Sequence, residues 1–167
     1  TPGLDSLFYT SDVDSEFLQL YRLDLRTGIH KVFLPSLKWD LEELEISPTG
    51  DQAALVINEA GFGQLRLLDL KTIELSAPAN LPRGLVSDLH WRSDGKELGF
   101  AVSAADSADD VFSLDTTSGQ LTRWTRRVTK AHGSPSIGVV RSFDGEVVPM
   151  MYWLPDPQRF AEPVRRP

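Results

Sequence analysis

The segment LYRLDLRTG at residues 20–28 recurs twice along the chain, as LRLLDLKTI at residues 65–73 and as VFSLDTTSG at residues 111–119. The three copies align without gaps, and the aspartates at their fifth positions are separated by 45 and then 46 residues. Self-similarity at a period of this length is typical of repeat architectures, in which each repeat forms one supersecondary unit. The fold is therefore a set of repeated units.

A second landmark follows the same period. ISPTGD at residues 46–51 matches WRSDGK at residues 91–96, again at a distance of 45 residues. Between the landmarks, residues 41–47 alternate apolar and acidic side chains, as a half-buried strand does, and residues 53–57 form a continuous apolar run typical of a strand buried on both faces. Further strands are expected at residues 65–70 and 74–77, with a loop at 58–61 between strands. Four strands in about 45 residues is the period of a β-propeller blade.

The repeated LDLxTG segment predicts a tight turn into the last strand of each blade. Gly28 and Gly119 can adopt the left-handed conformation that such a turn needs. Ile73 occupies the equivalent position in the second copy, so we expect a different turn there. The last strands themselves are expected at residues 29–34 in the first copy and 120–125 in the third.

Counting strands predicts an all-β chain with an incomplete propeller. Residues 36–80 and 81–127 each form a full four-stranded blade, whereas residues 1–35 form a partial blade. Propellers close with typically four to eight blades, which leaves no long sheet edge unpaired. We therefore expect the remaining blades to come from other chain segments, with self-association through the open blade edges as an alternative.

Composition excludes several classes of protein. The 167 residues are 41% hydrophobic and 25% charged, and they include no cysteine, which excludes disulfide scaffolds and cysteine-ligated metal centres. The longest purely apolar run, residues 53–57, is far too short to cross a membrane. Residues 1–120 carry a net charge of −11 and residues 121–167 a net charge of +4. An acidic body argues against nucleic-acid binding, so we expect a soluble protein that binds neither nucleic acid nor membrane, in the cytoplasm or the periplasm.

The repeat and the residues after it resemble the prolyl oligopeptidase family of serine peptidases, in particular its acylaminoacyl-peptidase-like members. The blade signature is shared with TolB-like and WD-type propellers, but residues 121–125 look like the closing strand of the family's propeller. After a linker at 128–138, the segment VVRSFDGEVVP at residues 139–149 is similar to the family's Ser-x-Asp-Gly-x-x-Ile-Pro hairpin, and MMYWLP at 150–155 fits its continuation. The resemblance implies that residues 139–167 begin an α/β-hydrolase domain. It also implies that the catalytic Ser, Asp and His lie beyond this segment, so this chain alone should not be catalytic.

The chain itself offers no convincing nucleophile or base. Its closest approach to a Gly-x-Ser-x-Gly nucleophile elbow is SPSIG at residues 134–138, which lacks the first glycine and lies in the expected linker. His30, His90 and His132 are isolated along the chain, without a nucleophile and an orienting acid nearby in the sequence. We expect no catalytic residue here.

Other candidate sites are also better explained as structure. The acidic clusters Asp12–Glu16 and Asp106, Asp109 and Asp110 are expected to be solvated loops rather than calcium sites, because the first lacks the glycine and the final glutamate of an EF-hand. GFG at residues 61–63 resembles a phosphate loop, but Arg66 stands where its third glycine is needed. Trp39-Asp40 is a WD dipeptide, but it lies before the first expected strand of a blade, whereas in WD repeats it ends the third strand. Only Phe62, at an expected loop tip, looks placed for a ligand or partner; we expect no metal or cofactor.

The sequence supports two functions from different classes. In the first, the chain is a non-catalytic propeller segment of a prolyl oligopeptidase-like serine peptidase, whose other blades and hydrolase domain complete it. Such a parent enzyme would hydrolyse short peptides through a Ser-His-Asp triad, with the propeller gating substrate access. In the second, the chain belongs to a TolB-like propeller that acts as a non-enzymatic scaffold for binding proteins.

Overall fold

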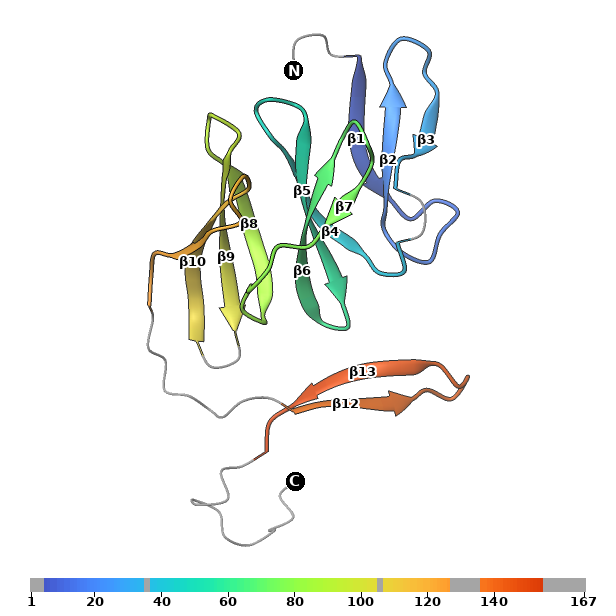
Figure 1. Ribbon diagram of the computed structural model, residues 1–167. Helices are drawn as coiled ribbons and strands as arrows, with labels where there is room; N and C mark the ends of the chain where they lie inside the picture. The colour runs from blue at the N-terminus through green and yellow to red at the C-terminus, as the bar shows by residue number, and fades with distance from the viewer. Residues whose placement is uncertain (1–4, 35–36, 105–106, 127–135, 155–167) are drawn as a thin grey trace, which may run out of the picture.

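The computed structural model describes residues 5–34, 37–104, 107–126 and 136–154, and the regular structure in these ranges consists of strands alone (Figure 1). Blade 1 consists of β1 (Ser6–Ser11), β2 (Gln19–Asp24) and β3 (His30–Val32). Blade 2 consists of β4 (Leu41–Ile46), β5 (Gln52–Glu59), β6 (Phe62–Asp69) and β7 (Leu75–Ser76). Blade 3 consists of β8 (Leu85–Trp91), β9 (Glu97–Ala104), β10 (Ser107–Asp115) and β11 (Leu121–Arg123). A separate hairpin pairs β12 (Ser136–Arg141) with β13 (Val147–Tyr152).

Each blade is an antiparallel meander in which consecutive strands are neighbours. The predicted all-β class and the division into one three-stranded and two four-stranded blades followed by a hairpin are confirmed. Several predicted boundaries shift. β6 begins at Phe62 rather than Leu65, because Ala60 and Gly61 both take positive φ (55° and 86°) and close the β5–β6 connection as a two-residue turn. β12 begins at Ser136, within the range expected to be linker.

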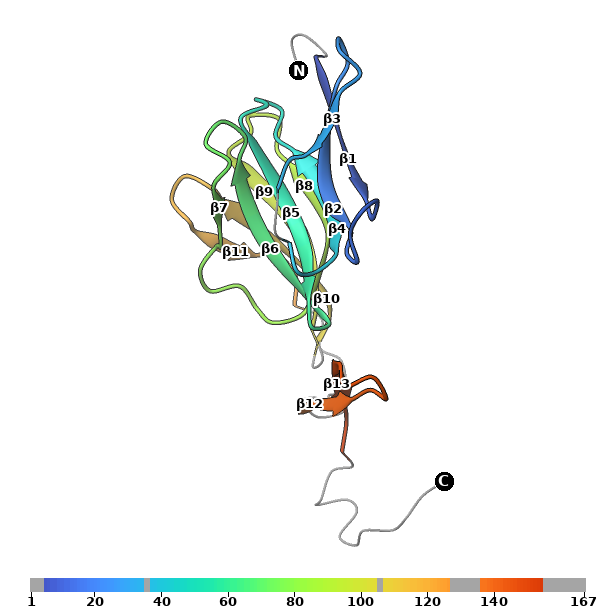
Figure 2. The same ribbon diagram turned by 90° about the vertical axis from the view of Figure 1, so that its right-hand side faces the viewer.

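The blades pack face to face, and the core lies between them (Figure 2). β5 supplies both interfaces: Ala53, Leu55 and Ile57 face blade 1, whereas Ala54 and Val56 face blade 3. All five side chains are buried, as the continuous apolar run predicts for a strand covered on both sides.

Polar contacts join the blades as well. The Leu18 amide donates to Asp40 Oδ1 at 2.8 Å, linking blade 1 to the entry of β4. The Leu89 amide donates to Glu43 Oε1 at 2.8 Å, and the Trp91 indole donates to the Glu45 carbonyl at 3.0 Å. Blades 2 and 3 are therefore fastened by directional bonds in addition to apolar packing.

The repeated aspartate forms the same turn in all three blades. One carboxylate oxygen of Asp24, Asp69 and Asp115 accepts the backbone amides two and three residues later, at 2.8–3.0 Å. The amide four residues on then donates to the aspartate's own carbonyl at 2.8–2.9 Å. This geometry explains why aspartate occupies the fifth position of every copy.

The expectation of a different turn at Ile73 is wrong. Ile73 adopts φ = 61°, close to the 72° of Gly28 and the 74° of Gly119, and its amide makes the same bond to Asp69 at 2.9 Å. The two aspartate-bound amides and the flanking strands hold the turn, so the chain bears the strain of a β-branched residue in the left-handed region.

Replacing Ile73 with glycine should therefore stabilise the protein. Relief of strain, offset by the larger backbone entropy of glycine in the unfolded chain, gives an expected gain of about 0.5–1 kcal/mol in the free energy of unfolding. Chemical denaturation measures it. The reciprocal variant Gly28→Ala is the control: a Cβ there meets nothing within 4 Å, so any loss of stability reports backbone conformation alone. An unchanged or lowered stability of Ile73→Gly would contradict this explanation.

The aspartate turns also predict an acid-sensitive fold. Amide donation, chiefly from Thr27, Thr72 and Ser118, holds the pKa of Asp24, Asp69 and Asp115 below its ordinary value of 3.8. A carboxyl whose pKa is lower in the folded state contributes stability that is complete above pH 3.8 and is lost as the pH falls toward the folded-state pKa. Urea midpoints measured against pH should thus decline below this value. The decline should be shallower when all three are replaced by asparagine, which keeps the acceptor oxygen but does not titrate; parallel curves would contradict the assignment.

Candidate interdomain surface at the loop end of the blades

The two ends of the blades differ in character. We call the end formed by the β1–β2 and β5–β6 connections and by the segments that enter β4 and β8 the loop end; the aspartate turns lie at the other. At blade 1 and the segment that enters β4, the loop end exposes Val13 (58%) and Trp39 (37%). Phe17 contacts Trp39 with ring centroids 6.3 Å apart, and the Tyr21 hydroxyl donates to the Val13 carbonyl. Apolar side chains are thus presented outward by a loop that the blade fixes in place.

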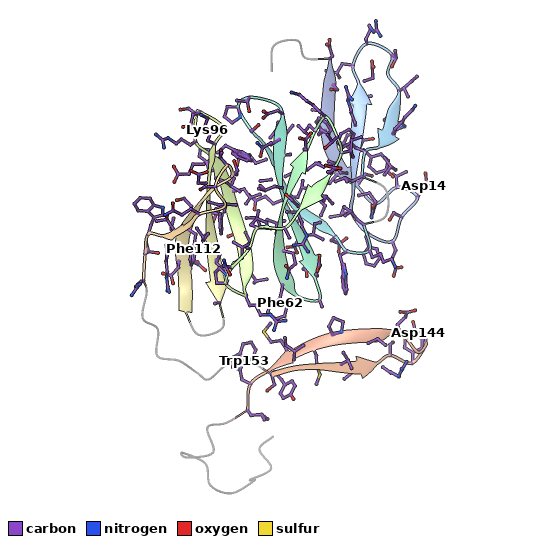
Figure 3. The ribbon with its side chains drawn as sticks, viewed as in Figure 1. Asp14, Phe62, Lys96, Phe112, Asp144 and Trp153 are labelled. Atoms are coloured by element: carbon purple, nitrogen blue, oxygen red, sulfur yellow. The ribbon has the colours of Figure 1, made fainter. Side chains whose placement is uncertain are left out.

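On blades 2 and 3 the loop end presents an aromatic ring and a cation. Phe62 opens β6, and the guanidinium carbon of Arg83 lies 4.8 Å from the centre of its ring. Figure 3 shows Phe62 at the end of the blades nearest the β12–β13 hairpin. Phe62, the residue predicted to be placed for a ligand or partner, therefore has a cationic neighbour. It is half-buried in a strand, however, rather than exposed at a loop tip as predicted.

Two glycines bring these loops together. The Gly63 amide donates to the Gly84 carbonyl at 3.1 Å. A Cβ at Gly63 would lie 2.6 Å from the Val86 nitrogen, and one at Gly84 would lie 2.5 Å from the Ser103 oxygen. Only glycine allows the backbones to approach so closely, and this approach determines where Phe62 and Arg83 lie.

The β12–β13 hairpin is apolar on both faces. Val139 lies opposite Pro149 on one face, and Val140 lies opposite Val148 on the other. Val139 is 65% exposed, the two other valines are 45% exposed, and Phe143 at the tip is fully exposed. Strands with apolar side chains on both faces are typical of a sheet covered on both sides.

Among the residues that the structure describes, the candidate nucleophile and bases are not brought together as a catalytic group. Of SPSIG, residues 136–138 lie in β12, and residues 134–135 are outside the described ranges, as is His132. His30 pairs through Nδ1 with the Tyr9 hydroxyl at 2.9 Å, and His90 Nδ1 lies 3.4 Å from Glu45. The first contact spans β2 to join β3 with β1 within blade 1, and the second joins β8 of blade 3 to β4 of blade 2.

The acidic clusters are partly corrected. Asp109 and Asp110 belong to β10 rather than to a loop, and Asp110 is buried, bonded by Arg123 and by the Thr125 hydroxyl; Asp106 is outside the described ranges. Residues 12–16 form a turn in which the Ser15 amide donates to the Asp12 carbonyl at 3.0 Å. Within the described ranges, no three acidic or histidine side chains are grouped as a metal site would require, and no helix is long and apolar enough to span a membrane.

The remaining motifs have structural roles. Gly61 lies in the β5–β6 turn, and Gly63, on the other side of Phe62, lies where β6 approaches blade 3. Asp40 of the WD dipeptide accepts a hydrogen bond from blade 1. Sequence reasoning missed Arg83. Its position before β8 says nothing about which ring it contacts, because that contact depends on how blades 2 and 3 pack.

Comparison with known proteins shows the fold. No family model matches the chain, and no curated sequence does. Among solved structures, prolyl oligopeptidase B from Galerina marginata superposes with a TM-score of 0.74 at 14% identity over 89% of this chain and 22% of its own. A puromycin hydrolase superposes with a TM-score of 0.72 at 20% identity over 87% of this chain and 23% of its own. TolB from Acinetobacter baumannii superposes with a TM-score of 0.58 at 20% identity over 90% of this chain and 35% of its own.

The chain spans less than a quarter of the length of the prolyl oligopeptidase and of the puromycin hydrolase, and about a third of TolB. The predicted resemblance is thus confirmed at the level of the fold: the chain has the fold of the propeller region of prolyl oligopeptidases.

Proposed function

We propose that this chain is a non-catalytic propeller segment of a serine peptidase of the prolyl oligopeptidase type. In the complete protein, residues 5–126 stack between further blades, and the β12–β13 hairpin begins the sheet of a hydrolase domain. That domain supplies a Ser-His-Asp triad that cleaves short peptides by acyl transfer, and the blades restrict which peptides reach it.

The observation that carries this proposal is the hairpin, which comes after the last blade and is apolar on both faces. A propeller that only binds proteins has no need of such an element, whereas the first strands of a covered α/β sheet require it. The superpositions support the same conclusion. They cover nearly equal shares of this chain, yet the TM-scores with the prolyl oligopeptidase (0.74) and the puromycin hydrolase (0.72) are higher than that with TolB (0.58).

The outer face of blade 1, which points away from blade 2, supports the presence of further blades. Strand register places Leu7, Tyr9, Tyr21 and Val32 together on this face. Leu7 is 51% exposed and Val32 is 43% exposed, and the two tyrosine rings are stacked with centroids 5.4 Å apart. This is the apolar surface that a neighbouring blade covers in a propeller.

A serine-directed fluorophosphonate tests the proposal. The full-length protein that carries this chain should be labelled and should hydrolyse short prolyl or acyl-aminoacyl reporter peptides. The 167-residue chain, prepared separately, should do neither. Turnover by the 167-residue chain, or a full-length protein inert to both reagents, would overturn the proposal.

The superposition on TolB favours a second candidate function, that of a propeller that serves as a scaffold for protein binding. The two candidates differ in the element expected after the hairpin. A His-Gly-Gly segment and a Gly-x-Ser-x-Gly elbow in the parent reading frame would support the peptidase, and another blade of about 45 residues would support the scaffold.

A further inference from the structure

We infer that Arg83, held on the ring of Phe62, is a binding point for a carboxylate of the peptide substrate. This inference rests on the proposed function, since it takes the loop end of the blades as the side facing the hydrolase domain. It adds a residue and a ligand chemistry to that surface.

The Phe62–Arg83 pair is positioned by the backbone. Two glycines and the bond from the Gly63 amide to the Gly84 carbonyl fix the start of β6 and the segment that enters β8, and each side chain is next in sequence to one of these glycines. The ring then offers its face to the guanidinium at 4.8 Å. Such stacking attracts the cation without using its N–H groups, so the planar fork is left to hydrogen-bond elsewhere.

The hydrogen-bonding groups of Arg83 are not engaged by carboxylates of the described residues. Three other arginines of the blades differ: Arg66 pairs with Glu59, Arg92 with Glu97, and Arg123 with Asp110. Arg83 is exposed, and its guanidinium makes no ion pair or hydrogen bond within the described ranges. A planar guanidinium whose N–H groups are available matches the shape of a carboxylate, which it binds through two parallel N–H···O bonds.

The charge of the molecule favours a peptide carboxylate as the partner. Residues 1–120 carry a net charge of −11, so the blades repel the one anion that every linear peptide with a free C-terminus carries. An arginine fixed at the loop end offsets this repulsion locally. The α-carboxylate and an acidic side chain share this chemistry, and matched peptides tell them apart.

The test is binding by isothermal titration calorimetry to the full-length protein, with tetra-alanine as the free acid, as the C-terminal amide, and as an amide in which one alanine is replaced by glutamate. The free acid should bind about tenfold more tightly than the amide, and Arg83→Gln should abolish this preference. Tighter binding of the glutamate peptide, also lost in Arg83→Gln, would identify side-chain carboxylates as ligands; binding equal to that of the plain amide would restrict the site to the α-carboxylate. The matched control is Arg26→Gln, an exposed arginine beside an aspartate turn at the opposite end, which should keep the preference.

Equal binding of acid and amide by the wild type, or an undiminished preference in Arg83→Gln, would overturn the inference. An equal loss for all three peptides would also overturn it, because Arg83 would then support the surface rather than read the charge of the ligand. The titrated protein is first treated with the fluorophosphonate, so binding is measured without turnover. Absence of hydrolysis would therefore contradict the proposed function without deciding the role of Arg83.

Discussion

Leu98→Ala should lower the free energy of unfolding by about 3 kcal/mol, the effect expected when a fully enclosed leucine is truncated and its surroundings cannot collapse. Leu98 is 0% exposed and belongs to the core between blades 2 and 3. In β9 it lies opposite Trp91 of β8 and Leu114 of β10, both buried. Because strands enclose the site on both sides, little relaxation into the cavity is expected.

Chemical denaturation monitored by tryptophan fluorescence gives the comparison. The matched control is Leu85→Ala, which removes the same atoms from a leucine that is 51% exposed, at the edge of the same blade. Its cost should stay within about 0.5 kcal/mol. Similar losses in the two variants would contradict the assignment of the core to the space between the blades.

Gly63→Ala should cost about 2–3 kcal/mol, because the added methyl group would press on backbone rather than on a side chain that can turn away. Its Cβ would lie 2.6 Å from the Val86 nitrogen and 3.3 Å from the Val86 oxygen, so blades 2 and 3 would have to separate locally. Since Gly63 also adjoins Phe62, the same change should displace the ring beneath Arg83.

Gly99→Ala is the control for the glycine prediction. This glycine lies within β9, outside the left-handed region, and an added Cβ would first meet the His90 oxygen at 3.6 Å, an ordinary contact. Its effect on the free energy of unfolding should be within about 0.5 kcal/mol. Two variants of equal stability would show that the approach of blades 2 and 3 tolerates a methyl group, contrary to this prediction.

The blades could be predicted from the sequence because their information is local. The aspartate and glycine of each turn, the apolar run of β5 and the 45-residue spacing all act within one blade, where period and turn chemistry decide the structure. Ile73 shows the limit of this reasoning: propensity alone argues against a left-handed isoleucine, but the Asp69 carboxylate and the paired strands impose it.

Contacts between blades could not be predicted in the same way. Glu43 and Leu89 are 46 positions apart, and nothing in either segment indicates that a β4 carboxylate meets a β8 amide. The same holds for Phe62 and Arg83, which meet only because Gly63 and Gly84 let two blades approach. The candidate surface is thus a product of packing, and sequence reasoning found only its aromatic member.

The structure of the full-length protein is the most direct test of the proposed architecture. It should show additional blades on the outer face of blade 1, covering Leu7 and Val32, and the β12–β13 hairpin within the sheet of a hydrolase domain at the loop end. A hairpin that leads instead into a further blade, or an outer face of blade 1 left open to solvent, would contradict it.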